Sequence, residues 1–297
     1  MKDQYYGDIN DYRKYGLLRA IIRASGFRLL VAWMLTPDDG SADGRFISYL
    51  EHPGKWSRHD PVLFQNIKEL LASGRKRRVS LIESTGLLPK AEYFSSHVPD
   101  TTSGRSSWFN SLTQRAQGSD FIFLDPDNGL EVKSKAYGRK DSSKFIYWRE
   151  VEALWASGKS LLIYQHFIRE KRLNFIQRML EALRIATPGS FVEAFSTSHV
   201  VFLMALQHEH QEFHEAIVNS VQENWEVQIH HWKLTRPQQG APADRSPAAR
   251  ARVGWPFRYT VSNVDLHRSN NKERMDENYQ ENASWEFQKI HWRDIRV

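Results

Sequence analysis

The feature that most constrains the fold is an apolar run at residues 121–131 that ends abruptly in acidic and turn-forming residues. The run is continuous rather than alternating, which is typical of a strand buried on both faces of a sheet. Pro126 cannot continue a central strand, and the Asn128-Gly129 pair favours a turn. Asp125 is therefore predicted to lie at the carboxyl end of a buried strand, the edge at which open α/β sheets bind ligands.

Strand-like and helix-like segments alternate along the chain, and this alternation predicts a mostly parallel sheet with helices on both faces. Two late strand-like runs with a tight connection add an antiparallel strand. The expected class is α/β: a three-layer Rossmann-like fold, with a mostly parallel sheet, a late antiparallel strand and a small C-terminal extension. The expected helices cover residues 8–25, 61–73, 106–117, 147–157, 168–186 and 209–222, and the expected strands cover 28–35, 79–83, 91–95, 121–124, 160–167, 191–195, 200–206 and 225–234.

A change in composition predicts where the main domain ends. Residues 1–234 form the expected Rossmann-like domain, and residues 235–254 have the proline- and glycine-containing composition of a linker. Residues 255–297 are too few to bury much of a core alone. We expect this extension to pack on the main domain, to pack on a partner (another protein or a second copy of the chain), or to be partly mobile.

Composition excludes several classes of chemistry. The chain has no cysteine, which rules out disulfides, zinc–thiolate sites, iron–sulfur clusters and a cysteine nucleophile. No apolar run reaches the length of a membrane span, so we expect a cytoplasmic protein without a membrane partner. The net charge of +6 favours polyanionic partners such as nucleic acid.

Two acidic segments are candidates for binding a cofactor. The loop at residues 36–44, which contains Gly40, follows the first buried strand but has no G-x-G-x-x-G motif, and its three aspartates would repel a phosphate. A metal or a cofactor without phosphates is compatible with this loop. Glu83 ends the second expected strand, where nucleoside-binding α/β folds hold ribose hydroxyls. A surface glutamate with no such role is the alternative.

Two basic segments are candidates for binding nucleic acid. Lys14 lies on the polar face of the helix at residues 8–25, which is either solvated or placed near a substrate. The segment at residues 132–144 is expected to be a mobile loop over the strand edge. It carries Lys133, Lys135, Arg139 and Lys140.

Two motifs carry a resemblance to a known family. Asp125-Pro126-Asp127-Asn128 is similar to the Asp/Asn-Pro-Pro-aromatic motif that ends the fourth strand of amino-methylating nucleic-acid enzymes. The first two positions match, whereas the second proline and the aromatic residue are replaced. Residues 7–15 resemble the opening helix of bacterial ribosomal RNA adenine-N6 methyltransferases. With the order of elements over residues 27–206, the chain resembles class I S-adenosylmethionine-dependent methyltransferases.

The resemblance implies roles for particular residues. Asp125 and the Pro126 carbonyl would accept the amine protons, with Asp127 and Asn128 completing the catalytic segment. Glu83 would bind the ribose of S-adenosylmethionine. Asp38 and the loop around Gly40 would lie near the amino-acid end of that cofactor. A flipped base stacks on an aromatic ring in such enzymes, and Tyr137, Tyr147 or Phe167 would replace the missing one.

His166 ends the strand at residues 160–167 at the same expected edge, and it is a further catalytic candidate. An ordinary polar residue at a strand end is the alternative.

A second interpretation is a metal-dependent nuclease or phosphodiesterase. Asp125, Asp127 and Glu131 have the oxygen ligands that Mg²⁺ or Mn²⁺ prefers, and His166 and Glu83 would complete the site. A third interpretation is a methyltransferase-like scaffold that binds partners without catalysis. The weak motif in the first loop and the C-terminal extension are compatible with it.

Overall fold

The computed structural model of the protein describes residues 1–38, 40 and 44–235. Residues Met1–Arg236 form one compact unit. The expected linker beyond residue 235 and the extension at residues 255–297 lie outside the described residues. Within the described part, none of the helices is both long enough and apolar enough to cross a membrane.

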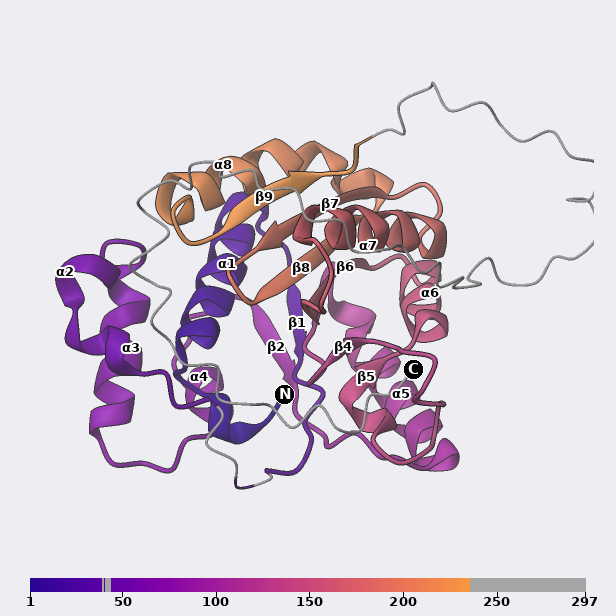
Figure 1. The fold of residues 1–297 in the computed structure, drawn as a ribbon, viewed down its shortest axis with the longest axis horizontal. Helices are drawn as coiled ribbons and strands as arrows, with labels where there is room; N and C mark the ends of the chain where they lie inside the picture. Colours follow the sequence, from indigo (N-terminus) through magenta and orange to yellow (C-terminus); the bar gives the residue numbers. More distant parts are fainter. Residues whose placement is uncertain (39, 41–43, 236–297) are drawn as a thin grey trace, which may run out of the picture. The chain divides into compact units, whose positions relative to one another are not determined.

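A seven-stranded mixed sheet forms the centre of this unit (Figure 1). The strand order is β2-β1-β3-β6-β8-β7-β9. Strands β2, β1, β3 and β6 are parallel, β8 is antiparallel to both β6 and β7, and β9 is antiparallel to β7. The bounds are β1 Leu29–Ala32, β2 Ala91–Phe94, β3 Phe121–Leu124, β6 Ser160–His166, β7 Phe191–Ser196, β8 Val200–Leu206 and β9 His230–Lys233. The expected α/β class is confirmed, and the architecture is compatible with a Rossmann-like fold.

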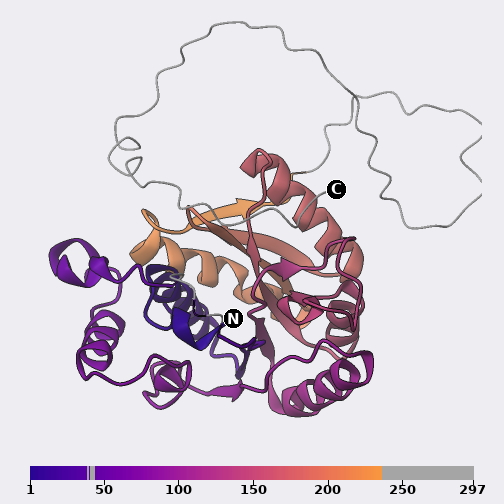
Figure 2. The same ribbon diagram turned by 60° about the horizontal axis from the view of Figure 1, so that its bottom comes forward.

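Helices cover both faces of the sheet because the strands bury side chains on both sides (Figure 2). In β3, Phe121 and Phe123 point to one face, and Ile122 and Leu124 point to the other. One face is covered by α1 Ile9–Ser25, α3 Pro61–Ala72 and α8 His214–Trp225, and the other by α5 Thr102–Arg115, α6 Trp148–Ala156 and α7 Arg172–Ala186. The shorter elements are α2 Pro53–Trp56, α4 Ser80–Glu83, β4 Gly129–Leu130, β5 Phe145–Ile146 and the 3₁₀ turns Asp3–Tyr5, Ser48–Glu51, Ala116–Gly118, Ser142–Lys144 and His208–Phe213.

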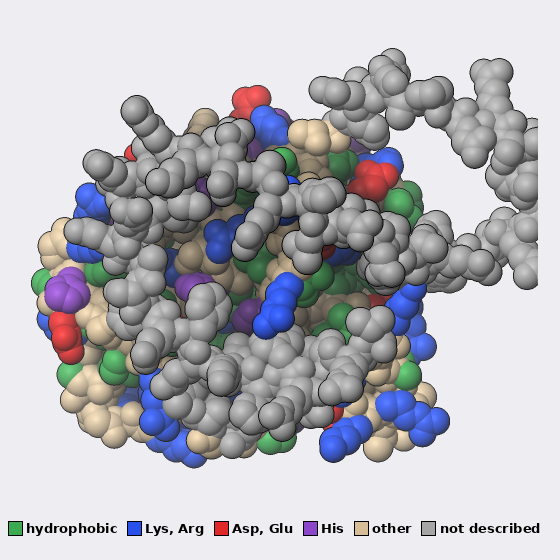
Figure 3. All heavy atoms as spheres, in the orientation of Figure 1, with side chains coloured by type: hydrophobic (Ala, Val, Ile, Leu, Met, Phe, Trp, Pro, Cys, Tyr) green, Lys and Arg blue, Asp and Glu red, His purple; other side chains and the backbone are tan. Residues whose placement is uncertain are grey.

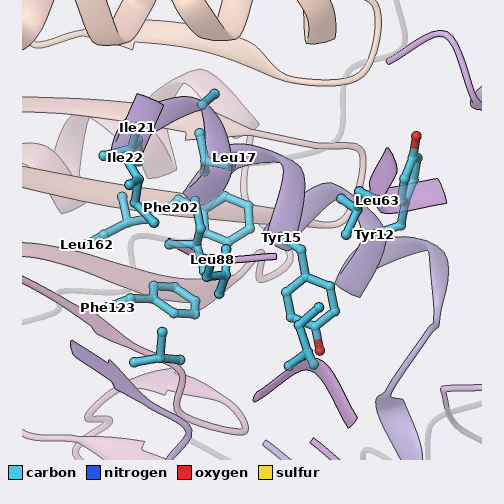
Figure 4. Packing of buried hydrophobic residues seen from close by; sticks show 14 of the residues in the cluster. Tyr12, Tyr15, Leu17, Ile21, Ile22, Leu63, Leu88, Phe123, Leu162 and Phe202 are labelled. Carbon is cyan, nitrogen blue, oxygen red and sulfur yellow. The ribbon is translucent and has the colours of Figure 1, made fainter. Parts of the chain in front are cut away.

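Helix α1 is the most enclosed helix of the first face. The Asp8 side chain caps it by accepting from the Asn10 amide at 2.9 Å, and Gly26 ends it in a left-handed conformation. Its apolar residues pack on the side chains of β3, β6 and β8 (Figure 4). The expectation that its basic face is solvated is wrong for Arg13 and Lys14, which are buried, and for Arg19, which is ion-paired with Asp60 at 2.6 Å. Arg23, near the end of the helix, is exposed as expected.

The segment at residues 79–83 was expected to be the second strand, and this expectation is wrong. The segment forms the short helix α4, with Val79 and Ile82 turned inward. Short apolar runs fit either a strand or a helical turn, so their spacing alone does not decide. The strand beside β1 is instead β2, in the segment expected to form a third strand.

Close packing between α1 and α8 depends on Gly16. The Trp225 indole lies against the Gly16 backbone, and a Cβ atom there would overlap the ring. We expect Gly16→Ala to lower the free energy of unfolding by about 1–3 kcal/mol through overpacking, although alanine favours a helix. Urea unfolding monitored by circular dichroism measures this. Gly54→Ala in α2 is the control, because open space surrounds that position. An equal gain in stability for both variants would contradict the packing argument.

Candidate functional site

The carboxyl ends of three parallel strands meet at one edge of the sheet. Ala32, Leu124 and Ile163 lie in register across β1, β3 and β6. The residues that follow them therefore emerge side by side. Asp125 follows β3 between the other two strands, and its backbone amide still donates to the Ala32 carbonyl at 3.0 Å. The expected position of Asp125 is thus the observed one.

The Asp125 carboxylate is buried and bound by Lys14 of α1. The Lys14 Nζ donates to Asp125 Oδ2 and to Asp11 Oδ1, both at 2.8 Å. Only 3% of the Lys14 side chain and 2% of the Asp125 side chain are exposed. Tyr15 donates to the other Asp11 oxygen at 3.2 Å, and the Tyr164 ring lies 5.1 Å from the Lys14 Nζ. Lys14 was a candidate for nucleic-acid binding, and the structure places it beneath the site instead.

The protonation states of this buried cluster follow from its charges. Burial alone would lower the pKa of Lys14, but the Asp11 and Asp125 carboxylates outweigh it and raise the pKa above its usual value. Burial raises the pKa of Asp11 and of Asp125, and Lys14 only partly opposes this. The cluster therefore holds a permanent ammonium between two carboxyl groups.

Asp127 offers a buried acceptor at the same edge. Its Oδ1 atom accepts no hydrogen bond from the described residues, although the Met1 amine lies 3.7 Å away. The Lys2 Nζ lies 3.7 Å from the other oxygen. Pro126 is buried, whereas Asn128 is exposed. A buried carboxylate oxygen without a hydrogen bond is unusual in a folded protein, and the charge of this one is balanced by the Met1 amine.

The turn after Asn128 is fixed by contact with β6. Gly129 has a φ of +109°, and a Cβ atom there would overlap the Gln165 side chain. Gln165 also accepts from the Leu130 amide at 2.7 Å. The glycine in this motif is therefore required by both its backbone conformation and its packing.

The loop after β1 has an unusual backbone. Met34 has a φ of +45°, a left-handed value that a non-glycine residue adopts at a cost in free energy. Asp38 is exposed and accepts from the Gln4 amide at 3.3 Å, and Gly40 has a φ of +70°. Such strain concentrates at functional edges, and it falls where the first cofactor loop was expected.

Glu83 lies at the expected edge of the sheet, although it does not belong to a strand. It belongs to α4 rather than to a strand, yet its Oε1 atom accepts from Ser95 Oγ at 2.6 Å, directly after β2. The Trp33 indole, directly after β1, donates to the same oxygen at 2.8 Å. The carboxylate therefore lies at the carboxyl ends of β1 and β2.

His166 ends β6 and contacts the Tyr164 ring, with the two centroids 5.1 Å apart. Its ring reaches solvent, but the surrounding protein removes part of its hydration. This desolvation lowers the pKa of His166, and the nearby Asp127 opposes the shift. The lowered pKa favours the neutral form of the imidazole.

Glu131 does not join the other acids. Its carboxylate accepts from the Trp148 amide at 3.2 Å, at the start of α6. Across residues 1–38, 40 and 44–235, no group of three or more histidines and acids is placed to hold a metal ion. The metal interpretation through Asp125, Asp127 and Glu131 gains no support from this geometry.

The basic segment at residues 132–144 is held in place by side-chain contacts. Asp100 accepts from the amides of Asp141 and Ser143, at 3.0 and 2.7 Å. Lys135 is paired with Asp141 at 2.9 Å. The three other basic candidates of this segment are exposed: Lys133, Arg139 and Lys140. Of the aromatic candidates, Tyr137 stacks beneath the Arg149 guanidinium, Tyr147 is buried and Phe167 is half-buried.

Sequence reasoning missed Asp11, Trp33 and Ser95. The only signal for Asp11 is its i, i+3 spacing to Lys14, which places both residues on one face of a helix. Trp33 and Ser95 each follow a strand directly, but nothing in their identity separates them from ordinary strand ends. All three are identified by their contacts in the folded chain.

The Lys14 cluster has a measurable role in stability. We expect Lys14→Met to lower the free energy of unfolding by about 3–5 kcal/mol, because it leaves two buried carboxyl groups without their shared cation. The loss should be smaller at pH 5 than at pH 8, since a carboxyl with a raised pKa in the folded state stabilises that state when protonated. Urea titrations at both pH values measure this.

Two further variants control the Lys14 experiment. Asp125→Asn in the Lys14→Met background should recover much of the loss, because it removes one unpaired charge. Arg28→Met breaks the exposed ion pair with Asp120 and should change stability little. A Lys14→Met protein as stable as the wild type would contradict the assigned role.

Buried tyrosines should make the fold sensitive to alkali. Burial raises the pKa of Tyr15, Tyr49 and Tyr164 well above 10. A raised folded-state pKa gives stability that is complete below the unfolded pKa near 10 and is lost as the pH rises further. We expect the free energy of unfolding to fall steeply above about pH 10. Tyr164→Phe should make that fall shallower in urea titrations between pH 8 and 11, and an unchanged slope would contradict this origin.

Comparison with known proteins does not assign a family to the chain. No family model and no curated protein matches its sequence.

Proposed function

We propose that the protein is an S-adenosylmethionine-dependent methyltransferase that acts on an amine of a nucleic acid. The observation that carries the proposal is the strand order, in which antiparallel β8 is inserted between β6 and β7. That insertion is the feature by which the order of elements resembles class I methyltransferases. The Asp125-Pro126 motif lies at the carboxyl end of the central strand β3, where the resemblance requires it.

The residues near β1 and β2 fit a nucleoside cofactor without phosphates. Glu83 is an acceptor at the ends of both strands, where a ribose hydroxyl pair would replace the Ser95 hydroxyl. Met34 gives the first loop the left-handed turn that a closely approaching ligand needs. The acidic loop around Asp38 suits the ammonium group at the amino-acid end of the cofactor.

The contacts of Asp125 favour different roles within the proposed catalytic segment. Because Lys14 binds the Asp125 carboxylate, Asp125 positions the segment rather than accepting amine protons. The acceptors that remain are the Pro126 carbonyl and Asp127 Oδ1, the latter free of hydrogen bonds from the described residues. They would orient the amine lone pair toward its electrophile.

S-adenosylmethionine supplies an electrophilic methyl group, so that a nitrogen–carbon bond forms as a sulfur–carbon bond breaks. The methylated nitrogen is then positively charged until it loses a proton. The imidazole of His166, at the end of β6, would take that proton. Exposed Lys133, Arg139 and Lys140 would attract the nucleic acid toward this edge.

Calorimetric titration with S-adenosylmethionine in EDTA tests the cofactor. We expect the wild type to bind and Glu83→Gln to bind at least about tenfold more weakly, ~1.4 kcal/mol, because glutamine keeps the Trp33 contact but is a poorer acceptor for ribose hydroxyls. Glu92→Gln, on the exposed side of β2, is the matched control and should bind like the wild type. A wild type that does not bind overturns the assignment.

Transfer of a radiolabelled methyl group to mixed RNA and DNA tests the chemistry. Asp127→Asn should retain cofactor binding but lose at least about tenfold in transfer rate, because the amide no longer presents two acceptor oxygens. Asp38→Asn, in the proposed cofactor loop, is the comparison. It should change the affinity for S-adenosylmethionine more than the methyl-transfer rate of the enzyme with cofactor bound. Full transfer activity in Asp127→Asn would exclude this residue as the acceptor.

A further inference from the structure

Arg13 carries a buried positive charge that forms no ion pair with a carboxylate of the described residues. Its Nε and Nη2 atoms donate to the neutral Gln228 side chain at 3.1 and 2.7 Å, and Nη1 makes only a long contact of 3.5 Å with Asn10. The guanidinium lies 5.4 Å from the Trp56 ring centroid, and 9% of the residue is exposed. No ion pair involves Arg13 within the described residues. Buried charges in proteins are normally paired.

The nearest acid does not compensate this charge. Asp8 accepts hydrogen bonds from the Asn10 and Phe46 amides and forms no ion pair with Arg13. Burial lowers the pKa of Arg13 to about 10, and Asp8 only partly opposes the shift. The guanidinium is therefore a desolvated cation at neutral pH, with donor capacity left at Nη1.

Two further side chains, those of Arg172 and His199, lie near Arg13. Arg172, at the start of α7, donates to the Ser198 carbonyl at 2.6 Å and is thereby tied to the β7–β8 turn. His199 lies in that turn, where desolvation lowers its pKa and the charges of Arg13 and Arg172 lower it further. Gln228, which accepts from Arg13, lies two residues before His230, and His230 pairs with Ser196 at the end of β7. The Arg13 contact is therefore at the same end of β7 as Ser198 and His199. Figure 3 shows Lys, Arg and His side chains in the middle of the face in view, over α1 and β8.

This region lies on the opposite side of the catalytic segment from the cofactor residues. Glu83 contacts the residue after β2, at one end of the order β2-β1-β3-β6-β8-β7-β9. His199 precedes β8, and Gln228, which binds Arg13, precedes β9. Asp127 follows β3, between the two sides. An anion held by Arg13 is therefore not the carboxylate of a cofactor bound near β1 and β2.

We propose that Arg13, Arg172 and His199 form a phosphate subsite that holds one backbone phosphate of a nucleic-acid strand. The inference rests on the proposed function and deepens it, because it assigns the nucleic-acid strand to the β7–β8 side of the site. Guanidinium groups match phosphate oxygens in geometry, and a desolvated one binds more strongly than one in water. The His199 ring would add one N–H donor.

Binding of a fluorescein-labelled single-stranded oligonucleotide, followed by anisotropy at several salt concentrations, tests the subsite. Arg13→Gln and Arg172→Gln should each weaken binding about tenfold at low salt and reduce the magnitude of the slope of log K against log salt by about one. The controls are Arg23→Gln and Arg184→Gln, which are exposed on the same two helices. They lie about 15 and 18 Å further along α1 and α7, and they should bind like the wild type.

Thermal unfolding separates a ligand-binding arginine from a structural one. Removing an unpaired buried charge should leave the Tm of Arg13→Gln equal to or above that of the wild type, whereas loss of a structural ion pair would lower it. Inorganic phosphate should raise the Tm of the wild type and have less effect on Arg13→Gln. A lower Tm with unchanged oligonucleotide affinity would overturn the proposal.

Titration of the same variants with S-adenosylmethionine distinguishes the two proposals. Cofactor affinity lost in Arg13→Gln, with oligonucleotide affinity retained, would overturn the phosphate subsite and assign the anion to the cofactor. A second outcome is a wild type that fails to bind the cofactor and still binds the oligonucleotide through Arg13 and Arg172. That result would support the subsite and overturn the methyltransferase assignment. Equal oligonucleotide affinity in all four variants would also overturn the subsite.

Discussion

The ammonium of Lys14 is the contact on which the geometry of the sheet edge depends. It joins α1 to the end of the central strand through Asp125, and it holds Asp11 on its own helix. A buried ammonium is tolerated only when carboxylates surround it, and those carboxylates in turn need the ammonium. The position of α1, and hence of Asp125-Pro126-Asp127, is therefore set by charge pairing as well as by the apolar contacts beneath it.

The sequence predicts those elements that have a distinctive local pattern. The continuous runs of β3 and β6 are apolar on both faces, and α1 has both a cap and a terminating glycine. Residues 79–83 are different, because five residues with three apolar positions satisfy a strand and a helical turn equally well. Only pairing with β1 decides between this segment and residues 91–94, and pairing is a tertiary property.

The candidate site was predictable in position but not in its internal contacts. Asp125 at the end of a buried strand follows from local sequence, because proline and Asn-Gly fix where the strand stops. The local sequence does not predict the partner of Asp125, because Lys14 is 111 residues away and a lysine on a polar helix face is normally solvated. Glu83 shows the reverse case: the secondary structure was wrong, yet the carboxylate reaches the strand ends because α4 lies beside β2.

Buried charges that lie close together in the sequence differ here in how completely they are hydrogen-bonded. Lys14 binds two carboxylates, whereas Arg13, beside it on α1, forms no ion pair within the described residues. Asp125 is bound by Lys14, while Asp127 Oδ1 lies 3.7 Å from the Met1 amine and accepts no hydrogen bond from the described residues. Burying an unsatisfied polar group costs free energy, so such groups are retained where a ligand satisfies them. Arg13 and Asp127 have opposite chemistry. An acceptor and a cation together suit a molecule with an amine and a phosphate, and a nucleotide carries both.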